Sequence, residues 1–298
     1  MKLSHESKVR LGVGIGAFVL IVGLVFGASR TLIHFDGPWD LDDVVSGLSG
    51  RDDAVDADVL NDGGKYSAQP QQLSSATFDA DEFRYLDFDI AAATVDVKVV
   101  DGNKVRVIER GRVAKGVDAS KAATQNIASV KDSALKISQF RSDDGKAIDR
   151  TVTVELPRRV AEHLKGVNAH VRSGDLQIAG IICDGFDLFL DSGDVKFAGG
   201  VTDALSAEVD SGDVTFDLNQ APANSMDVTV GSGDVEMTVP NSTGFKASLT
   251  LGSGDFESDF LPDGYDGEAV SNLEFDNGDK SATYRFEVGS GDVSFGSE

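Results

Sequence analysis

The feature that most constrains this chain is a tripeptide, Ser-Gly-Asp, which recurs at nearly regular intervals in the C-terminal half. Successive glycines are 19, 19, 21, 21 and 37 residues apart. A period of this length is typical of solenoids, in which each coil buries its apolar side only by stacking on its neighbours. We therefore predict an all-β fold, a single-domain β-solenoid, with the repeats over residues 167–298 and one insertion before the last copy.

Each repeat shows the same alternation around its tripeptide. Apolar residues stand two and four places before the serine, as Val209 and Ala207 do before Ser211. The alternation resumes after the tripeptide, as in Val214 and Phe216. Because successive side chains of a strand point to opposite faces, each coil is expected to contain two short strands, each apolar on one face and polar on the other.

The glycine of each copy is expected to be a structural turn residue. A sharp corner between two strands needs positive φ, which glycine adopts without a Cβ clash, and the flanking Ser and Asp can bond nearby backbone amides. The six turn glycines are Gly174, Gly193, Gly212, Gly233, Gly254 and Gly291.

The aspartates of the tripeptides should form a column along one edge, about 4.8 Å apart where neighbouring coils pair directly. We expect these carboxylates to cap backbone amides. A bridging calcium ion is the alternative, although the calcium-binding β-roll repeat has a shorter period and further glycines. The aspartates are Asp175, Asp194, Asp213, Asp234, Asp255 and Asp292.

No residue pattern indicates catalysis, a cofactor or an assigned metal site. A pair of carboxylates would suit polysaccharide cleavage, but every copy carries the same aspartate, whereas a catalytic centre should interrupt the repeat. His34, His163 and His170 match no metal-binding or triad spacing. We therefore expect a protein that is not an enzyme, with a calcium-binding repeat or a polysaccharide-acting enzyme as the weaker alternatives.

Alternation begins near Thr77, so the predicted domain spans residues 77–298. Three apolar runs ahead of the repeats predict short strands, with a tight turn at residues 101–103 between the second and the third. The runs cover residues 86–90, 95–99 and 105–107.

Two hairpins and one helix are also predicted after residue 76. Residues 135–137 and 152–156 should pair as one hairpin. Residues 273–275 and 284–286, on either side of an Asn-Gly turn, should form the other. Residues 118–130 are the one plausible helix in the exported part, with Asp118 as a possible N-cap.

The N-terminal region predicts a membrane anchor. Residues 11–28 form an uncharged apolar run long enough to span a bilayer, so we assign residues 11–29 to a transmembrane helix. Basic residues precede the run and only Arg30 follows it closely, which places residues 1–10 in the cytoplasm and the rest outside, an N-in, C-out topology. A cleaved signal peptide is the alternative. Residues 30–76, rich in Asp, Gly and Ser, indicate an acidic stalk.

The negative charge of the chain restricts the classes of partner that it can bind. The net charge is −23, and the part of the chain from Thr31 onward contains 49 acidic and 23 basic residues. Such a surface repels phosphate backbones and anionic headgroups, which argues against nucleic acid and against peripheral docking on a membrane. Residues 157–165, and a set formed by Arg106, Arg110, Arg112 and Lys115, could receive an acidic partner, but solvated loops explain them more simply.

Cys183 is the only cysteine, so no intramolecular disulfide can form. It follows Ile181 and Ile182, which predicts a small buried residue.

An apolar N-terminal segment, the alternating opening FRYLDFDIAAATVDVKVV and successive SGDV corners resemble a bacterial family of unknown function known as putative adhesins. The likeness covers about residues 77–298. The resemblance implies a β-solenoid, a location in the cell envelope and, in some members, a link to envelope stress systems. It supplies no catalytic residues.

Two functional hypotheses follow. The first is an adhesin-like surface module that binds cell-wall polymer or another surface ligand. The second is a structural or regulatory envelope component that acts through a membrane protein or by self-association. Unpaired strand edges at an open end of a solenoid make self-association physically reasonable.

Overall fold

The computed structural model describes residues 64–139, 145–261 and 273–298, and Lys65–Glu298 form one compact unit. In this part of the chain no helix is long and apolar enough to cross a membrane. The predicted cytoplasmic segment 1–10, the transmembrane helix 11–29 and most of the stalk 30–76 lie outside the described residues. The stalk prediction extends too far at its C-terminal end, because the first strand already begins at Gln71.

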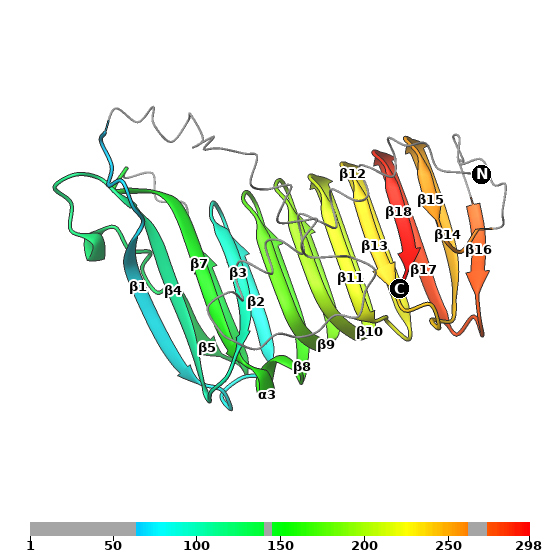
Figure 1. Cartoon of the computed structure of the whole chain (residues 1–298), viewed down its shortest axis with the longest axis horizontal. Helices are drawn as coiled ribbons and strands as arrows, with labels where there is room; N and C mark the ends of the chain where they lie inside the picture. Colours follow the sequence, from blue (N-terminus) through cyan, green and yellow to red (C-terminus); the bar gives the residue numbers. More distant parts are fainter. Residues whose placement is uncertain (1–63, 140–144, 262–272) are drawn as a thin grey trace, which may run out of the picture. The chain divides into compact units, whose positions relative to one another are not determined.

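The described unit is all-β, as predicted, with eighteen strands and two single-turn helices (Figure 1). The helical turns are η1 (Ala119–Lys121) and α3 (Arg158–Ala161). The strands are β1 (Gln71–Asp79), β2 (Tyr85–Ile90), β3 (Thr94–Val100), β4 (Lys104–Val113), β5 (Ala128–Lys131), β6 (Ala134–Gln139), β7 (Ala147–Pro157), β8 (Leu164–Val171), β9 (Leu176–Leu190), β10 (Val195–Ser211), β11 (Val214–Gln220), β12 (Ser225–Ser232), β13 (Val235–Val239), β14 (Phe245–Ser253), β15 (Phe256–Ser258), β16 (Leu273–Asn277), β17 (Ala282–Ser290) and β18 (Val293–Ser297).

The strands form two facing layers joined at the Ser-Gly-Asp corners. The pre-corner layer contains the strands that run into a corner, the post-corner layer contains the strands that leave one, and each layer is extended at its ends by strands that pair with these. The long strands β9 and β10 each begin in the post-corner layer and end in the pre-corner layer. In space the pre-corner layer runs β5–β6–β2–β8–β9–β10–β12–β17–β14–β16. The post-corner layer runs β1–β4–β7–β3–β9–β10–β11–β13–β18–β15.

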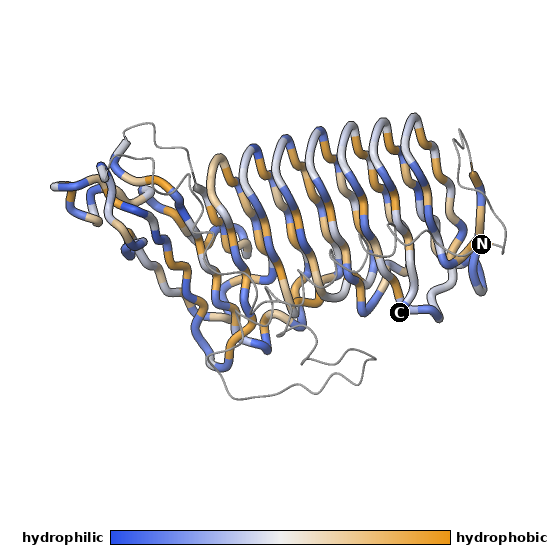
Figure 2. The backbone as a smooth tube through the Cα atoms, turned by 45° about the horizontal axis from the view of Figure 1, so that its top comes forward, coloured by the Kyte–Doolittle hydropathy of each residue, from blue (hydrophilic) through white to orange (hydrophobic). Residues whose placement is uncertain are grey.

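Parallel pairing in register stacks equivalent residues into columns, so the fold is solenoid-like. Val209, for example, pairs with Leu190 on one side and with Val230 on the other, and all three are buried. Figure 2 shows the resulting alternation of apolar and polar residues along each coil. Apolar side chains of both layers meet between them and form one continuous core.

The coils do not stack in the order of the sequence. The last coil, β17–β18, lies between β12–β13 and β14–β15, so that β17 pairs in parallel with both β12 and β14. In Figure 1 the red β18 accordingly lies between the yellow β13 and the orange β15. At the other end the first coil, β2–β3, lies between β6–β7 and β8–β9.

This order overturns the predicted hairpin of residues 273–275 and 284–286. These segments lie in β16 and β17, and β14 separates them, pairing antiparallel with β16 and parallel with β17. Alternation specifies which face of a strand is apolar and leaves its neighbour undetermined. The Asn-Gly turn therefore connects strands on either side of β14.

The same principle explains the differences at the other end. The tight turn at residues 101–103 joins β3 to β4, but β7 lies between these strands and pairs with both. The predicted hairpin of residues 135–137 and 152–156 is also wrong. The first segment belongs to β6 in the pre-corner layer and pairs with β2 and β5, whereas the second belongs to β7 in the post-corner layer.

The helix predicted over residues 118–130 is reduced to the single turn η1. Asp118 does cap this turn, accepting hydrogen bonds from the Ser120 amide and hydroxyl at 2.9 and 2.6 Å. The chain beyond it bends at residues 122–123 and turns at 125–126, where the Thr124 amide donates to Glu109 and the Ala122 carbonyl accepts from Arg150. Backbone groups bound to buried side chains are not available to a continuing helix.

Candidate functional site

The six corners share one backbone conformation. The φ angles are 114° at Gly174, 123° at Gly193, 134° at Gly212, 135° at Gly233, 121° at Gly254 and 138° at Gly291. Residues with a Cβ rarely adopt this region, so each corner favours glycine for a conformational reason.

A second requirement comes from the stacking of the corners. A Cβ built on Gly212 would lie 1.8 Å from the carbonyl oxygen of Gly193 in the preceding coil. The equivalent distance is 2.0 Å from Gly233 to Gly212 and 1.9 Å from Gly291 to Gly233. These glycines therefore allow the backbones of successive coils to approach more closely than any side chain would permit.

The aspartates of the corners form a hydrogen-bonded column in the order Asp175, Asp194, Asp213, Asp234, Asp292 and Asp255. Each carboxylate except the last accepts a hydrogen bond from the amide of the next aspartate in the column, over 2.9 to 3.3 Å. A backbone hydrogen bond also joins each pair of neighbouring corners. The amide of the residue that follows one aspartate donates to the carbonyl of the next aspartate in the column, as Val195 does to Asp213 at 3.0 Å. The last two members are reversed relative to the sequence, because the final coil is inserted.

The chemistry of the column is structural. One oxygen of each capping carboxylate is engaged by a backbone amide of the next coil, which ties neighbouring corners together. Within the described ranges, no group of three or more His, Cys, Asp or Glu side chains is arranged to hold a metal ion.

The corner of the first coil was not predicted from the sequence, because it lacks the Ser-Gly-Asp tripeptide. The Asp175 carbonyl accepts from Val95 at 2.8 Å, and a Cβ on Gly174 would lie 2.3 Å from the carbonyl of Ala93. Ala93 therefore occupies the corner of the first coil. A signal was present, since Ile90 and Val95 have the same five-residue spacing as Val171 and Leu176.

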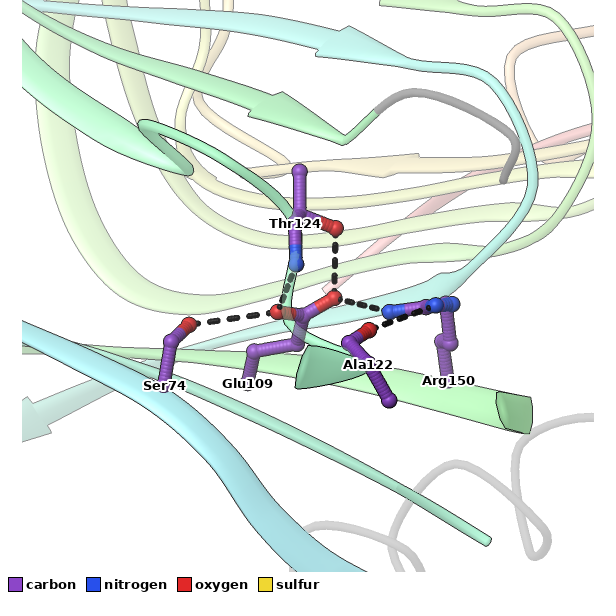
Figure 3. Close-up of polar contacts among 5 residues, drawn as sticks. All are labelled: Ser74, Glu109, Ala122, Thr124 and Arg150. Atoms are coloured by element: carbon purple, nitrogen blue, oxygen red, sulfur yellow. Dashed lines mark hydrogen bonds and ion pairs between the residues drawn. The ribbon is translucent and has the colours of Figure 1, made fainter. Parts of the chain in front are cut away.

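A second site of interest is a buried polar cluster in which Ser74 of β1, Glu109 of β4 and Arg150 of β7 meet Ala122 and Thr124 (Figure 3). The fully buried Glu109 carboxylate accepts from Arg150 Nη1 at 2.6 Å, from the Thr124 amide and hydroxyl at 2.8 and 2.6 Å, and from the Ser74 hydroxyl at 3.1 Å. Arg150 also donates to the Ala122 carbonyl at 2.8 Å. The cluster thereby holds Ala122 and Thr124 against β4 and β7.

The sequence contained a signal for this cluster that was not used. Glu109 follows Val105 and Val107 in the same period-two phase, and Arg150 precedes Val152 and Val154 likewise. Both charged side chains are thus placed on the inward face of their strands, where each needs a partner.

We expect Glu109→Gln to destabilise the domain by about 3 kcal/mol, because the neutral amide leaves the buried Arg150 guanidinium without a counter-charge. Equilibrium unfolding in denaturant measures the change. Glu155→Gln is the matched control, since its partner Arg106 is exposed and the pair at 3.2 Å is worth at most about 1 kcal/mol. Equal effects of the two substitutions would refute a special role for the buried pair.

The two basic segments are held in ion pairs on the domain itself. Arg159 lies 2.7 Å from Asp81, and Lys165 lies 2.6 Å from Asp184. In the other segment, Arg106 pairs with Glu155. Arg112 is buried and lies 3.1 Å from Asp149. These contacts stabilise strands and turns, which reduces the charge available to an acidic partner.

Cys183 is buried at the core and its thiol donates weakly to the Gly200 carbonyl at 3.7 Å. Burial raises the pKa of this thiol to about 12, with a smaller contribution from Asp184. The folded state therefore favours the protonated thiol. The contribution of this preference to the free energy of unfolding is complete below the pKa of the thiol in the unfolded chain, and it is lost as the pH rises toward 12.

We therefore expect Cys183 to resist alkylation in the native protein at pH 8 and to react only after unfolding, because the thiolate is the reactive species. Mass spectrometry after timed exposure to iodoacetamide measures the reaction. Thr229→Cys, at an exposed position of β12, is the control and should be labelled rapidly in the same sample. Equal native labelling rates for both cysteines would contradict this expectation.

The corners and the core define a class: a solenoid-like β protein in which the repeated residues serve the stacking of coils. The match of residues 84–295 to the Toastrack DUF4097 family gives a more specific identity. The chain belongs to this family.

Comparison with solved structures gives matches of low sequence identity. A putative cell adhesion protein from Clostridium sporogenes is 14% identical, with a TM-score of 0.44, and the alignment covers 77% of this chain and 100% of that one. A putative adhesin from Bacteroides fragilis is also 14% identical, with a TM-score of 0.31 and coverage of 77% and 98%. A putative lipid binding protein from Parabacteroides distasonis is 11% identical, with a TM-score of 0.26 and coverage of 77% and 98%. No curated protein matches the chain.

Proposed function

We propose that this chain is a non-enzymatic, adhesin-like module of the cell envelope. In this proposal residues 11–29 form a single membrane helix, the N-terminus is cytoplasmic and the β domain is displayed outside. The uncharged run at 11–28 with its basic N-terminal flank supports the anchor. Membership of the Toastrack family is compatible with this role and assigns no reaction.

The observation that carries the binding role is the outer face of the pre-corner layer. Two large hydrophobic side chains are exposed in the described unit, Tyr85 at 45% and Phe189 at 37%, and both belong to strands of this layer. The Tyr85 ring lies against Gly166, because a Cβ built on that glycine would be 3.1 Å from Tyr85 Cδ1. Exposed aromatic rings on a rigid layer provide contact area at low cost in conformational entropy.

Polar side chains border the Phe189 ring. His170 packs edge-to-face on Phe189, with ring centroids 5.1 Å apart, and Asp187 and Glu208 are exposed on the neighbouring positions of β9 and β10. Aromatic rings bordered by hydrogen-bonding groups suit a polyhydroxylated ligand such as a cell-wall polymer. This face is the binding surface in our proposal.

Two experiments test the proposal. In intact cells, a membrane-impermeant maleimide should label Thr229→Cys of the full-length protein and should label Ser4→Cys only after lysis. The opposite pattern would refute the topology. Sedimentation with purified wall material should then retain the full-length protein, and Tyr85→Ser with Phe189→Ser should weaken binding at least tenfold, as expected for two anchoring residues.

Thr215→Ser, on the outer side of β11 in the post-corner layer, is the control and should bind normally. Unchanged binding of the double variant would remove this face from the proposal. Crosslinking in living cells that reproducibly captures a membrane protein, with no retention on wall material, would instead favour the structural or regulatory role.

A further inference from the structure

Four strands end the two layers, and they differ in length. β1 has nine residues, whereas β5 has four, β15 has three and β16 has five. In Figure 1 β1 and β16 lie at opposite ends of the described unit. Short terminal strands offer few backbone groups to another chain, so β1 is the one substantial edge in the described part of the protein.

The pairing of β1 leaves one side open among the described residues. β1 pairs antiparallel with β4, from Gln71 opposite Gly111 to Asp79 opposite Lys104. In such a ladder alternate residues direct their N–H and C=O groups away from the partner. A bulge between Gln72 and Ser74 interrupts the ladder, so the regular part of the edge runs from Ser74 to Asp79.

The edge is also the most neutral part of the exported chain. Residues 66–78 contain no Asp, Glu, Lys or Arg, the longest such run beyond residues 11–28 in a chain of net charge −23. The terminal strand β16, by contrast, carries Glu274 and Asp276. Two copies of so acidic a protein repel each other, and they can approach closely only where charge is absent.

The side chains of β1 favour a partner with the same sequence. Ser75 and Thr77 are exposed on one face, and Ala76 and Phe78 are half-buried on the other. Phe78 already packs against the main core, so an added strand would cover more of it. In an antiparallel pair of two β1 strands centred near Ala76, Asp79 faces an uncharged residue, so no like charges oppose each other.

We propose that β1 pairs antiparallel with β1 of a second copy, which continues the post-corner layer across a twofold axis. The occupant of the edge is therefore another molecule of this chain, joined through backbone hydrogen bonds at Ser74–Asp79. This inference does not depend on the ligand-binding role, although a shared membrane would raise the effective concentration of the strands.

Cysteine scanning of the full-length protein in membranes tests the pairing. In a Cys183→Ser background, Ser75→Cys, Ala76→Cys and Thr77→Cys are oxidised with copper phenanthroline and analysed by non-reducing electrophoresis. Residues opposite themselves in an antiparallel pair have Cα atoms about 4.5–5.5 Å apart, within the range of a disulfide. We expect a dimer band that peaks sharply at one of these positions, and Thr229→Cys, exposed within β12, should give none.

Mass measurement of the full-length protein in detergent provides the second readout. Ser75→Lys with Thr77→Lys places like charges face to face and should raise the dimer dissociation constant at least tenfold, while Thr229→Lys should leave it unchanged. A monomer at all concentrations together with no crosslink at residues 75–77 would overturn the proposal. Crosslinks from these positions to a different protein, or to the N-terminal segment of the same molecule, would overturn it as well.

Discussion

Truncation after Ser281 is expected to remove two coils from the folded unit, although it deletes the residues of only one. The deleted segment contains β17 and β18, which lie between β12–β13 and β14–β15. Burial of Phe286, Val288, Val293 and Phe295 alone contributes about 6–12 kcal/mol, a sum comparable to the stability of a whole domain. We therefore expect β14–β16 to lose all protection in hydrogen–deuterium exchange.

Restacking of β14 directly on β12 would be the contrary outcome, since backbone pairing alone would permit it. The aromatic contacts argue against restacking. Phe245 stacks on Tyr284 with centroids 5.0 Å apart, and Phe245 and Phe260 contact Phe295 at 5.4 and 5.1 Å. Their partners in β17 and β18 would be missing. Protected amides in β14 of the truncated protein would show that the coils are interchangeable.

Deletion of residues 273–277 provides the matched control for truncation. β16 is internal in the sequence but outermost in space, and it pairs only with β14 in the described unit. Its loss should cost less than about 3 kcal/mol, roughly the burial of Phe275, with effects limited to β14 and β15. The position of a strand in the stack, and not its order in the sequence, is thus expected to decide the cost of its deletion.

Gly212→Ala is expected to destabilise the domain by about 4 kcal/mol or more, as measured by equilibrium unfolding in denaturant. The new methyl group would lie 1.8 Å from the Gly193 carbonyl oxygen, so the corner column must open locally. This separation would also stretch two hydrogen bonds to the preceding coil, one from the Asp213 amide to the Asp194 carboxylate and one from the Val195 amide to the Asp213 carbonyl.

Gly102→Ala is the control that separates the steric clash between coils from the strain of a positive φ angle. Gly102 has the same φ of 134°, but a Cβ there would meet no atom within 4 Å. Its substitution should therefore cost only the backbone strain, about 1–2 kcal/mol. Equal effects at the two positions would mean that close approach between coils contributes nothing to the glycine requirement.

Much of the repetitive region was predictable because its period and alternation are local properties of the sequence. The spacing of Gly193 and Gly212 gives the length of a coil, and the phase of Val209 and Val214 gives the buried face. The order of the coils was not predictable in this way. β12, β14 and β17 have the same alternation and pair in the same register, so nothing local distinguishes sequential stacking from insertion.

The conformation of residues 118–130 was harder to predict, for a different physical reason. Helix propensity suggested a helix over residues 118–130, but buried polar groups on distant strands determined the conformation. Glu109 and Arg150 bind the amide of Thr124 and the carbonyl of Ala122, contacts that bridge 15 and 28 residues. A charged residue in an apolar phase indicates that such a contact exists, but it does not identify the partner.

The inserted position of β17–β18 also affects how the protein can be made. Strands β17 and β18 complete the interior beside β14 and β15, yet they leave the ribosome later, because they follow these strands in the sequence. Coils up to β13 can form while synthesis continues, whereas β14 and β15 must wait without their neighbour. A ribosome that stalls between β15 and β17 would thus release a product in which Phe245 and Phe260 lack their aromatic partners Tyr284 and Phe295. The order of the strands therefore couples the folding of β14 and β15 to the synthesis of the strands that follow them.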